Sequence, residues 1–351
     1  MATDFGVSLR EVAPVAGWYF LLYGVTQPLW GLCSDRLGRI RTMRLTLGFA
    51  AFFGVLSVFA PTLSLLVVAR ACTGAAMAGV VPAGLVYVGD AVPFAQRQRT
   101  LTDLNAATAV GITLATAGGG VLAAAVSWRA AFLVTALTAG VLAAVLRVLP
   151  EPPRVGTPAG AFGVLVRSGW ARLVLALALV EGAALLGLLT YLAPVLQSSG
   201  LSASAAGLAA GAYGLGLLAT SRIVKRLLLR VPPARFLAAG SGVLVAAHLL
   251  VALSQAPWVV TLAALLIGVA WAGMHSTMQA WATEVVPGAR ALMVSLFTGV
   301  LFVGSGLATS LLSPLAGQLR WSALFAVGAG LAAAFGVVAP LARHRFGNSK
   351  S

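Results

Sequence analysis

The feature that most constrains this chain is a succession of apolar runs, each long enough to cross a membrane as a helix. A transmembrane helix needs about 20 mostly apolar residues. The runs are too long for barrel strands and lack the alternation of a strand. We therefore predict an all-α membrane protein with about eleven transmembrane helices. The predicted spans lie near 13–33, 43–61, 63–90, 102–126, 129–149, 171–197, 203–224, 234–255, 257–285, 291–316 and 321–342.

The composition argues against a water-soluble protein. Of the 351 residues, 60% are hydrophobic and only 9% are charged, whereas soluble domains carry roughly 25% charged residues. An integral membrane enzyme would need His, Asp, Glu or Cys gathered at one depth. The three His residues are far apart in the sequence, so we expect no enzyme, no metal and no cofactor.

The positive charge has two possible readings. The net charge of +15 comes from 23 Lys and Arg against 8 Asp and Glu, and suits either nucleic-acid binding or the cytoplasmic face of a membrane protein. All but four of these basic residues fall in the breaks on one side of the predicted membrane; the exceptions are Arg10, Arg129 and Arg320 on the other side and Arg70 inside a span. This distribution excludes a nucleic-acid partner and predicts that the basic side is cytoplasmic. An odd number of spans then places the N-terminus of this chain outside and the C-terminus inside.

The longest polar break divides the chain into two parts. It covers 150–169 and is rich in proline. We predict an N-terminal half-bundle at 1–149 with five spans, a cytoplasmic linker at 150–169, and a C-terminal half-bundle at 170–351 with six spans and a short basic tail.

The two parts repeat each other. Asp90-Ala-Val-Pro is echoed by Glu284-Val-Val-Pro, and Trp128 is echoed at almost the same spacing by Trp321. Each acidic residue ends a long span and each Trp opens one. Parallel repeats of this kind are typical of secondary transporters with two bundled halves.

One break carries a recognisable motif. After the first span the chain reads Gly31-Leu-Cys-Ser-Asp35-Arg36-Leu-Gly38-Arg39. Gly31 allows a neighbouring helix to approach closely. Asp35 lies at the membrane boundary and needs a partner, for which Arg39 is one helical turn away. The segment resembles the signature loop of the major facilitator superfamily, with both glycines, the Asp and both basic residues in register.

The resemblance implies a fold of two pseudo-symmetric helical bundles and a function in transport. It also implies that Asp35, Arg39 and Asp90 form a charge cluster that latches the halves at the cytoplasmic face. Arg70, in Arg70-Ala-Cys-Thr-Gly, resembles the intramembrane Arg of this family and is a candidate for proton coupling. In the family the signature loop follows the second span. The first family span is therefore missing from this chain, either because the start was placed too far downstream or because this is an eleven-span variant.

A second family motif is only partly present. The antiport signature of the fifth family span is similar to the segment 111–120, which keeps the closing glycines Gly118, Gly119 and Gly120 but has Ala115-Thr116 in place of Gly-Pro. The matching loop of the second half, 219–226, keeps its basic residues but lacks the Asp and the glycines. The expectation of proton antiport therefore rests on only part of the family motif.

Few polar side chains fall within the spans. Glu181 is the acid most clearly inside an apolar run and is a candidate proton carrier if it faces the cavity; alternatively it lies near the boundary and reaches toward water. Candidates for lining a substrate cavity share helix faces at i, i+4 spacing, although ordinary bundle packing would also account for them. They are Tyr23, Gln27, Trp271, His275 and Gln279.

We therefore predict a monomeric multi-pass transporter of the inner cell membrane, with a small-molecule substrate, protons and the lipid bilayer as its partners. The expected activity is proton-coupled efflux of small organic or drug-like molecules. The alternatives are uptake of a small metabolite, or a non-transporting scaffold or sensor if the protein truly lacks the first family span.

Overall fold

The computed structural model describes residues 1–152, 161–227 and 231–348, and these residues form helices without any strand. The first part of the chain forms α1 (Ala2–Phe5), α2 (Leu9–Val12), α3 (Pro14–Leu37), α4 (Arg39–Val58), α5 (Leu63–Met77), α6 (Val80–Ala91), α7 (Phe94–Ala125), α8 (Trp128–Val145) and the short 3-10 helix η1 (Leu146–Val148). The second part forms α9 (Ala161–Arg167), α10 (Gly169–Gly182), η2 (Ala183–Gly187), α11 (Leu192–Ser198), α12 (Ala203–Ala210), α13 (Ala212–Leu227), α14 (Pro233–Leu253), α15 (Pro257–Val285), η3 (Pro287–Ala289), α16 (Arg290–Leu311), α17 (Ser313–Gly317) and α18 (Trp321–Asn348).

The predicted spans coincide with long helices, so the predicted fold class is confirmed. Among the described residues, 9 helical stretches are long and apolar enough to cross a membrane. The other two predicted spans coincide with α3, which Tyr19, Tyr23 and Gln27 make less apolar, and with α7, which holds a shorter apolar stretch at Val110–Ala125. The nine stretches are Arg39–Val58, Leu63–Ala91, Trp128–Val148, Gly169–Ser198, Ala203–Val224, Pro233–Leu253, Pro257–Val285, Leu292–Gly317 and Trp321–Asn348.

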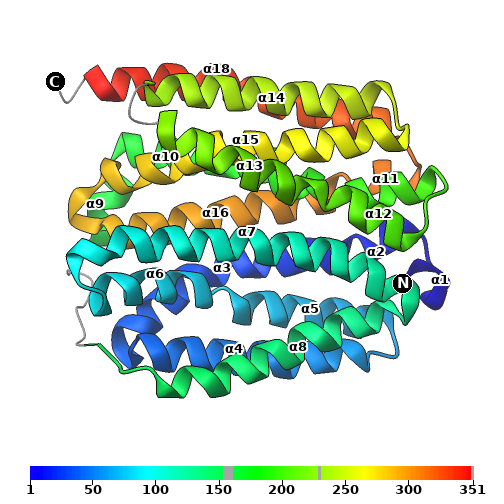
Figure 1. Cartoon of the computed structure of the whole chain (residues 1–351), viewed down its shortest axis with the longest axis horizontal. Helices are drawn as coiled ribbons and strands as arrows, with labels where there is room; N and C mark the ends of the chain where they lie inside the picture. Colours follow the sequence, from blue (N-terminus) through cyan, green and yellow to red (C-terminus); the bar gives the residue numbers. More distant parts are fainter. Residues whose placement is uncertain (153–160, 228–230, 349–351) are drawn as a thin grey trace.

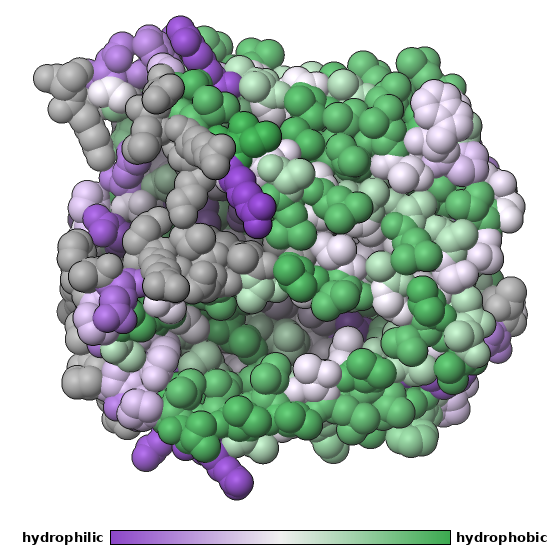
Figure 2. Space-filling view, in the orientation of Figure 1, coloured by the Kyte–Doolittle hydropathy of each residue, from purple (hydrophilic) through white to green (hydrophobic). Residues whose placement is uncertain are grey.

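The helices lie side by side along one axis (Figure 1). The pair α14 and α18 forms one edge, α4 and α8 form the other, and α3, α7 and α16 lie between them. The two chain ends are at opposite ends of the bundle, as an odd number of spans requires (Figure 1). Hydrophilic residues gather at the end that holds the C-terminus, while the rest of this face is mostly apolar (Figure 2). We call this end the basic end; the exposed Arg36, Arg41 and Arg44 lie there, at the turn between α3 and α4.

The predicted division into 1–149, 150–169 and 170–351 stays a prediction. The structure packs α3 against α16 and α7 against α12 and α13. Part of the predicted linker and of its basic charge lies outside the described residues, namely Pro153, Arg154, Gly156 and Pro158, as do Arg230 and Lys350.

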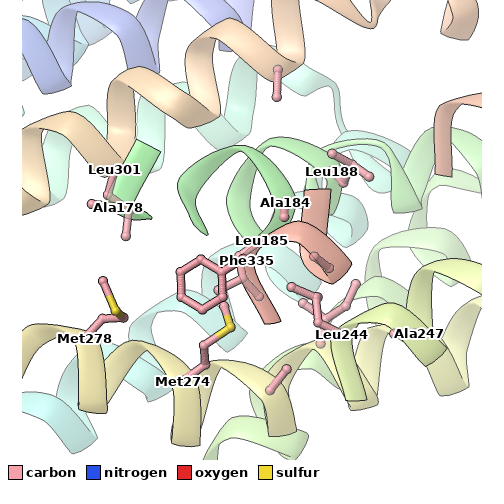
Figure 3. Packing of buried hydrophobic residues seen from close by; sticks show 14 of the residues in the cluster. Ala178, Ala184, Leu185, Leu188, Leu244, Ala247, Met274, Met278, Leu301 and Phe335 are labelled. Carbon is pink, nitrogen blue, oxygen red and sulfur yellow. The ribbon is translucent and has the colours of Figure 1, made fainter. Parts of the chain in front are cut away.

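The largest buried cluster lies among the helices that follow residue 160. Met274 of α15 points toward Phe335 of α18 and Leu185 of η2 (Figure 3). The wide turn η2 is a π-helix, and the carbonyl oxygen of Ala184 within it lies 2.9 Å from Nε2 of the fully buried His248. Such turns interrupt a helix ladder and need an outside partner for the freed carbonyl. His248 therefore provides a partner for a carbonyl of the wide turn that directly follows the helix carrying Glu181.

Candidate functional site

A cluster of charges closes the turn between α3 and α4 at the basic end. Nη1 of Arg39 lies 2.6 Å from Oδ1 of Asp35, and its Nε lies 3.1 Å from Oδ2 of Asp90, at the end of α6. The Arg39 side chain is only 5% exposed. The structure thus brings together the three residues that the motif singled out. Arg36 points to the surface, and Gly31 faces Ser295 of α16.

Glu151 is a member of this cluster that the sequence reasoning missed. Its carboxylate accepts hydrogen bonds from the backbone N–H groups of Arg39, Ile40 (3.2 Å) and Arg41 (3.1 Å) at the start of α4. The preceding residue, Gly38, has no side chain to cap the helix. A carboxylate at this position satisfies unpaired N–H groups and suits the positive end of the helix dipole. Glu151 therefore ties the chain after α8 to the signature turn.

Gly38 is required at this turn for two reasons. Its backbone has φ 105° and ψ 163°, a region open essentially to glycine alone, and a Cβ would overlap the Glu151 carboxylate. We expect Gly38→Ala to destabilise the protein by about 1–3 kcal/mol, measured as a lower thermal unfolding midpoint in detergent. Gly48→Ala, in open space on α4, is the matched control and should leave the midpoint unchanged or raise it. Equal midpoints for the two variants would contradict this account.

The second part of the chain has a different ion pair at the corresponding position. Glu284, which repeats Asp90, receives Arg343 of α18 in a two-pronged pair with N–O distances of 2.8 and 3.1 Å. The guanidinium also lies near the rings of Trp281 and Phe346. The loop at 219–226 has lost its Asp, and an Arg from the last helix supplies the partner instead. The sequence offered no signal for this pairing.

A buried acid–imidazole pair lies inside the bundle. Oε1 of Glu181 on α10 lies 3.1 Å from Nδ1 of His275 on α15, and Glu181 is 0% exposed. Its Oε2 has no hydrogen-bond partner among the described residues. The His275 ring lies 4.5 Å from the Trp271 ring and 5.8 Å from the Phe297 ring. Glu181 is therefore shielded from water in this structure, and its part in proton transfer stays a prediction.

The cavity candidates fall in two places. Trp271, His275 and Gln279 form a half-buried stripe on α15, between positions that are fully buried. Tyr23 and Gln27 instead face α16: the Tyr23 ring lies 4.1 Å from the Phe302 ring, and Gln27 is 1% exposed. A role for any of the five in substrate binding stays a prediction.

Arg70 lies apart from the buried pair. Its guanidinium carbon is 4.6 Å from the ring centre of Tyr19 on α3 and 4.6 Å from that of Phe132 on α8. In the part of the chain that the structure describes, no carboxylate oxygen lies within the 4.0 Å range of an ion pair with it. Its predicted part in proton coupling stays a prediction.

Glycines bring helices into contact away from the basic end. A Cβ at Gly120 of α7 would lie 2.7 Å from the Cα of Gly207 on α12. On α3, a Cβ would overlap α16 at Gly17 and Gly24, but at Gly31, near the basic end, it would make an ordinary 3.6 Å contact. Close approach through glycine is typical of helix pairs in membranes. The contact between α3 and α16 is thus closer at Gly17 and Gly24 than at Gly31.

We expect Gly120→Val to separate α7 from α12. The valine side chain would overlap the backbone of Ala203 and Gly207, so that this end of the bundle opens. Maleimide labelling of Ala117→Cys, in a chain whose Cys33 and Cys72 are replaced by Ser, should rise several-fold. Gly118→Val, at a position with nothing within 4 Å, should leave labelling unchanged. Labelling that is equal in both variants would contradict this contact.

Long apolar helices with charged clusters at one end are the features of a multi-pass membrane protein. The sequence matches the family model of the Major Facilitator Superfamily over residues 1–287 and again over 191–346, and the chain belongs to this family. The predicted family is therefore confirmed.

Relatives and solved structures agree with this assignment. The chain is 33% identical over 158 residues to a triacylglyceride transporter of Mycolicibacterium hassiacum, covering 44% of this chain and 29% of that protein. It is 32% identical over 161 residues to multidrug resistance protein D of Escherichia coli, covering 45% of this chain and 40% of that protein. The matches thus span well under two thirds of these relatives. The crystal structure of the nucleoside transporter NupG (D323A mutant) shares the fold, with a TM-score of 0.77 at 13% identity, covering 98% of this chain and 93% of that chain.

Proposed function

We propose that this chain is a secondary active transporter that exports small organic molecules in exchange for protons, and that Glu181 and His275 carry the proton. The observation that supports this most strongly is the fully buried Glu181 carboxyl, hydrogen-bonded to an imidazole inside the bundle. Ionisable residues within membrane spans are costly to keep and generally mark ion or substrate pathways.

The pair has the chemistry that proton exchange requires. A carboxyl and an imidazole can hold a proton in their shared hydrogen bond, and either atom can release it. Within the described residues, Oε2 of Glu181 has no hydrogen-bond partner, and it is the position at which a proton can bind. His275 continues the half-buried stripe of Trp271 and Gln279, which would give the proton and the substrate one shared surface.

The remaining parts of the proposal follow from charge and resemblance. We place the basic end in the cytoplasm because basic loops stay inside, and we assign the Asp35–Arg39–Asp90 cluster to a latch that holds that end in one conformation. The glycine contacts away from the basic end would then close the outer side. Export is favoured by the similarity to multidrug resistance protein D, and we propose a monomer of two half-bundles.

Proteoliposomes that contain the purified chain and a pH-sensitive dye test this function. A panel of amphipathic organic compounds is added on one side in the presence of a proton gradient. At least one compound is expected to evoke proton flux above that of protein-free liposomes. Flux that no compound evokes, from protein shown to be folded by its thermal transition, would contradict proton-coupled transport.

A further inference from the structure

In the described part of the chain, the half-buried Arg70 has no acidic side chain within ion-pair distance. Arg39, Arg129 and Arg343 each lie within ion-pair distance of an Asp or Glu. Arg70, inside the apolar stretch Leu63–Ala91, has only the faces of Tyr19 and Phe132 within the described residues. An arginine within a span is expensive unless its charge is paired.

The two rings leave most of the hydrogen-bonding capacity of Arg70 unused. An aromatic face attracts the cation as a whole, but the guanidinium carries five N–H donors in its plane. These donors match a carboxylate, which an arginine binds through two parallel hydrogen bonds. Since a guanidinium stays charged at all physiological pH values, Arg70 suits anion binding better than proton exchange.

The surroundings of Arg70 add an aromatic surface. The Tyr19 ring lies 6.2 Å from the Tyr23 ring, and Tyr23 lies 4.1 Å from Phe302 on α16. The row therefore leads from the cation to the contact between α3 and α16. Arg70 is itself partly exposed, and the molecular face is hollowed between α7 and the helices α5 and α8, which carry Arg70 and Phe132 (Figure 2).

We propose that Arg70, Tyr19 and Phe132 form a binding site for the carboxylate of a small aromatic acid, which makes arylcarboxylates a substrate class of this transporter. The carboxylate pairs with the guanidinium, and the aryl group packs along the ring row, where offset or edge-on contacts are favourable. The inference rests on the proposed function, because it names the substrate that the proton exchange would drive.

Equilibrium binding tests this site without transport. The full chain in neutral detergent is titrated with benzoate, its neutral isostere benzamide, and the aliphatic hexanoate, and the thermal midpoint is followed. Benzoate should raise the midpoint saturably, benzamide should bind at least tenfold more weakly, and hexanoate should fall between them. Equal shifts with benzoate and benzamide, or none with benzoate, would overturn the proposal.

Variants separate the site from a general effect of charge. Arg70→Gln should weaken benzoate binding at least tenfold, whereas Arg129→Gln, which removes another arginine that contacts aromatic rings, should leave it unchanged. If Arg70→Gln does not fold, Phe132→Leu serves instead and should weaken benzoate but not hexanoate. Unchanged benzoate affinity in the variant that folds overturns the site.

Two further arms fix the source of the anion and the link to transport. In nanodiscs, phosphatidylglycerol in place of phosphatidylcholine should leave benzoate affinity unchanged; competition by the anionic lipid would assign Arg70 to a lipid headgroup and overturn the proposal. Binding without proton flux would count against the proposed function alone, and flux without benzoate binding would count against this inference alone.

Discussion

Glu181→Gln is expected to reduce proton-driven transport to the level of protein-free liposomes while leaving the protein folded. Gln has nearly the shape of Glu and can keep the hydrogen bond to Nδ1 of His275, which is 3.1 Å long in the wild type. What it lacks is a group that gains and loses a proton. The variant should therefore still exchange substrate for substrate across the membrane without a pH gradient, a process that needs binding but no proton.

The control for this variant is Glu11→Gln. Glu11 is an exposed acid outside the predicted spans, and the N–H and hydroxyl groups of Ser8 hydrogen-bond to it and lower its pKa. Its removal should leave both proton-driven transport and exchange at wild-type rates. Proton-driven transport that survives in Glu181→Gln would show that the Glu181 carboxyl is not needed to carry the proton and would contradict the proposed role of the pair.

Arg39→Gln should have the largest effect at the basic end. The substitution leaves Asp35 and Asp90 without the cation that lies between them. Removing one partner of a fully buried ion pair costs about 3–5 kcal/mol; since the two Asp side chains are 21% and 19% exposed, we expect about 2–3 kcal/mol here. Thermal unfolding in detergent measures this loss, and the proposed latch requires that transport fall along with it.

Arg36→Gln provides the comparison in the same turn. Arg36 is exposed and forms no ion pair in the described structure, so its loss should change stability by less than about 0.5 kcal/mol. If Arg36→Gln lost as much stability as Arg39→Gln, the total charge of the loop, and not the geometry of the cluster, would determine stability.

The spans could be predicted because the length of an apolar run decides by itself whether a helix can cross a bilayer. The pair Asp35–Arg39 could be predicted as well, since residues four apart on a helix are neighbours. Asp90 was predicted to join this pair only through resemblance to a family. Local spacing carries no information about which distant helix will pack alongside.

The parts that could not be predicted depend on such packing. Glu181 and His275 were each singled out, but their pairing brings together α10 and α15, which are far apart in the sequence. Glu151 follows α8 in the chain but caps the start of α4. Nothing in the sequence around Glu151 indicates that it lies at a helix N-terminus. The partner of Glu284 could not be predicted either. Arg343 lies in a basic C-terminal segment, and such segments are common at the ends of membrane proteins whether or not they pair with an acid.

The central claim, that Glu181 and His275 exchange a proton for substrate, is tested most directly by counting protons when substrate binds. Purified protein in weakly buffered detergent, with a pH-sensitive dye, is mixed with a compound that evokes proton flux in liposomes. Wild-type protein is expected to release about one proton for each molecule bound. Glu181→Gln is expected to bind the compound and release none. Proton release that persists in this variant, or binding by the wild type without any release, would contradict the account.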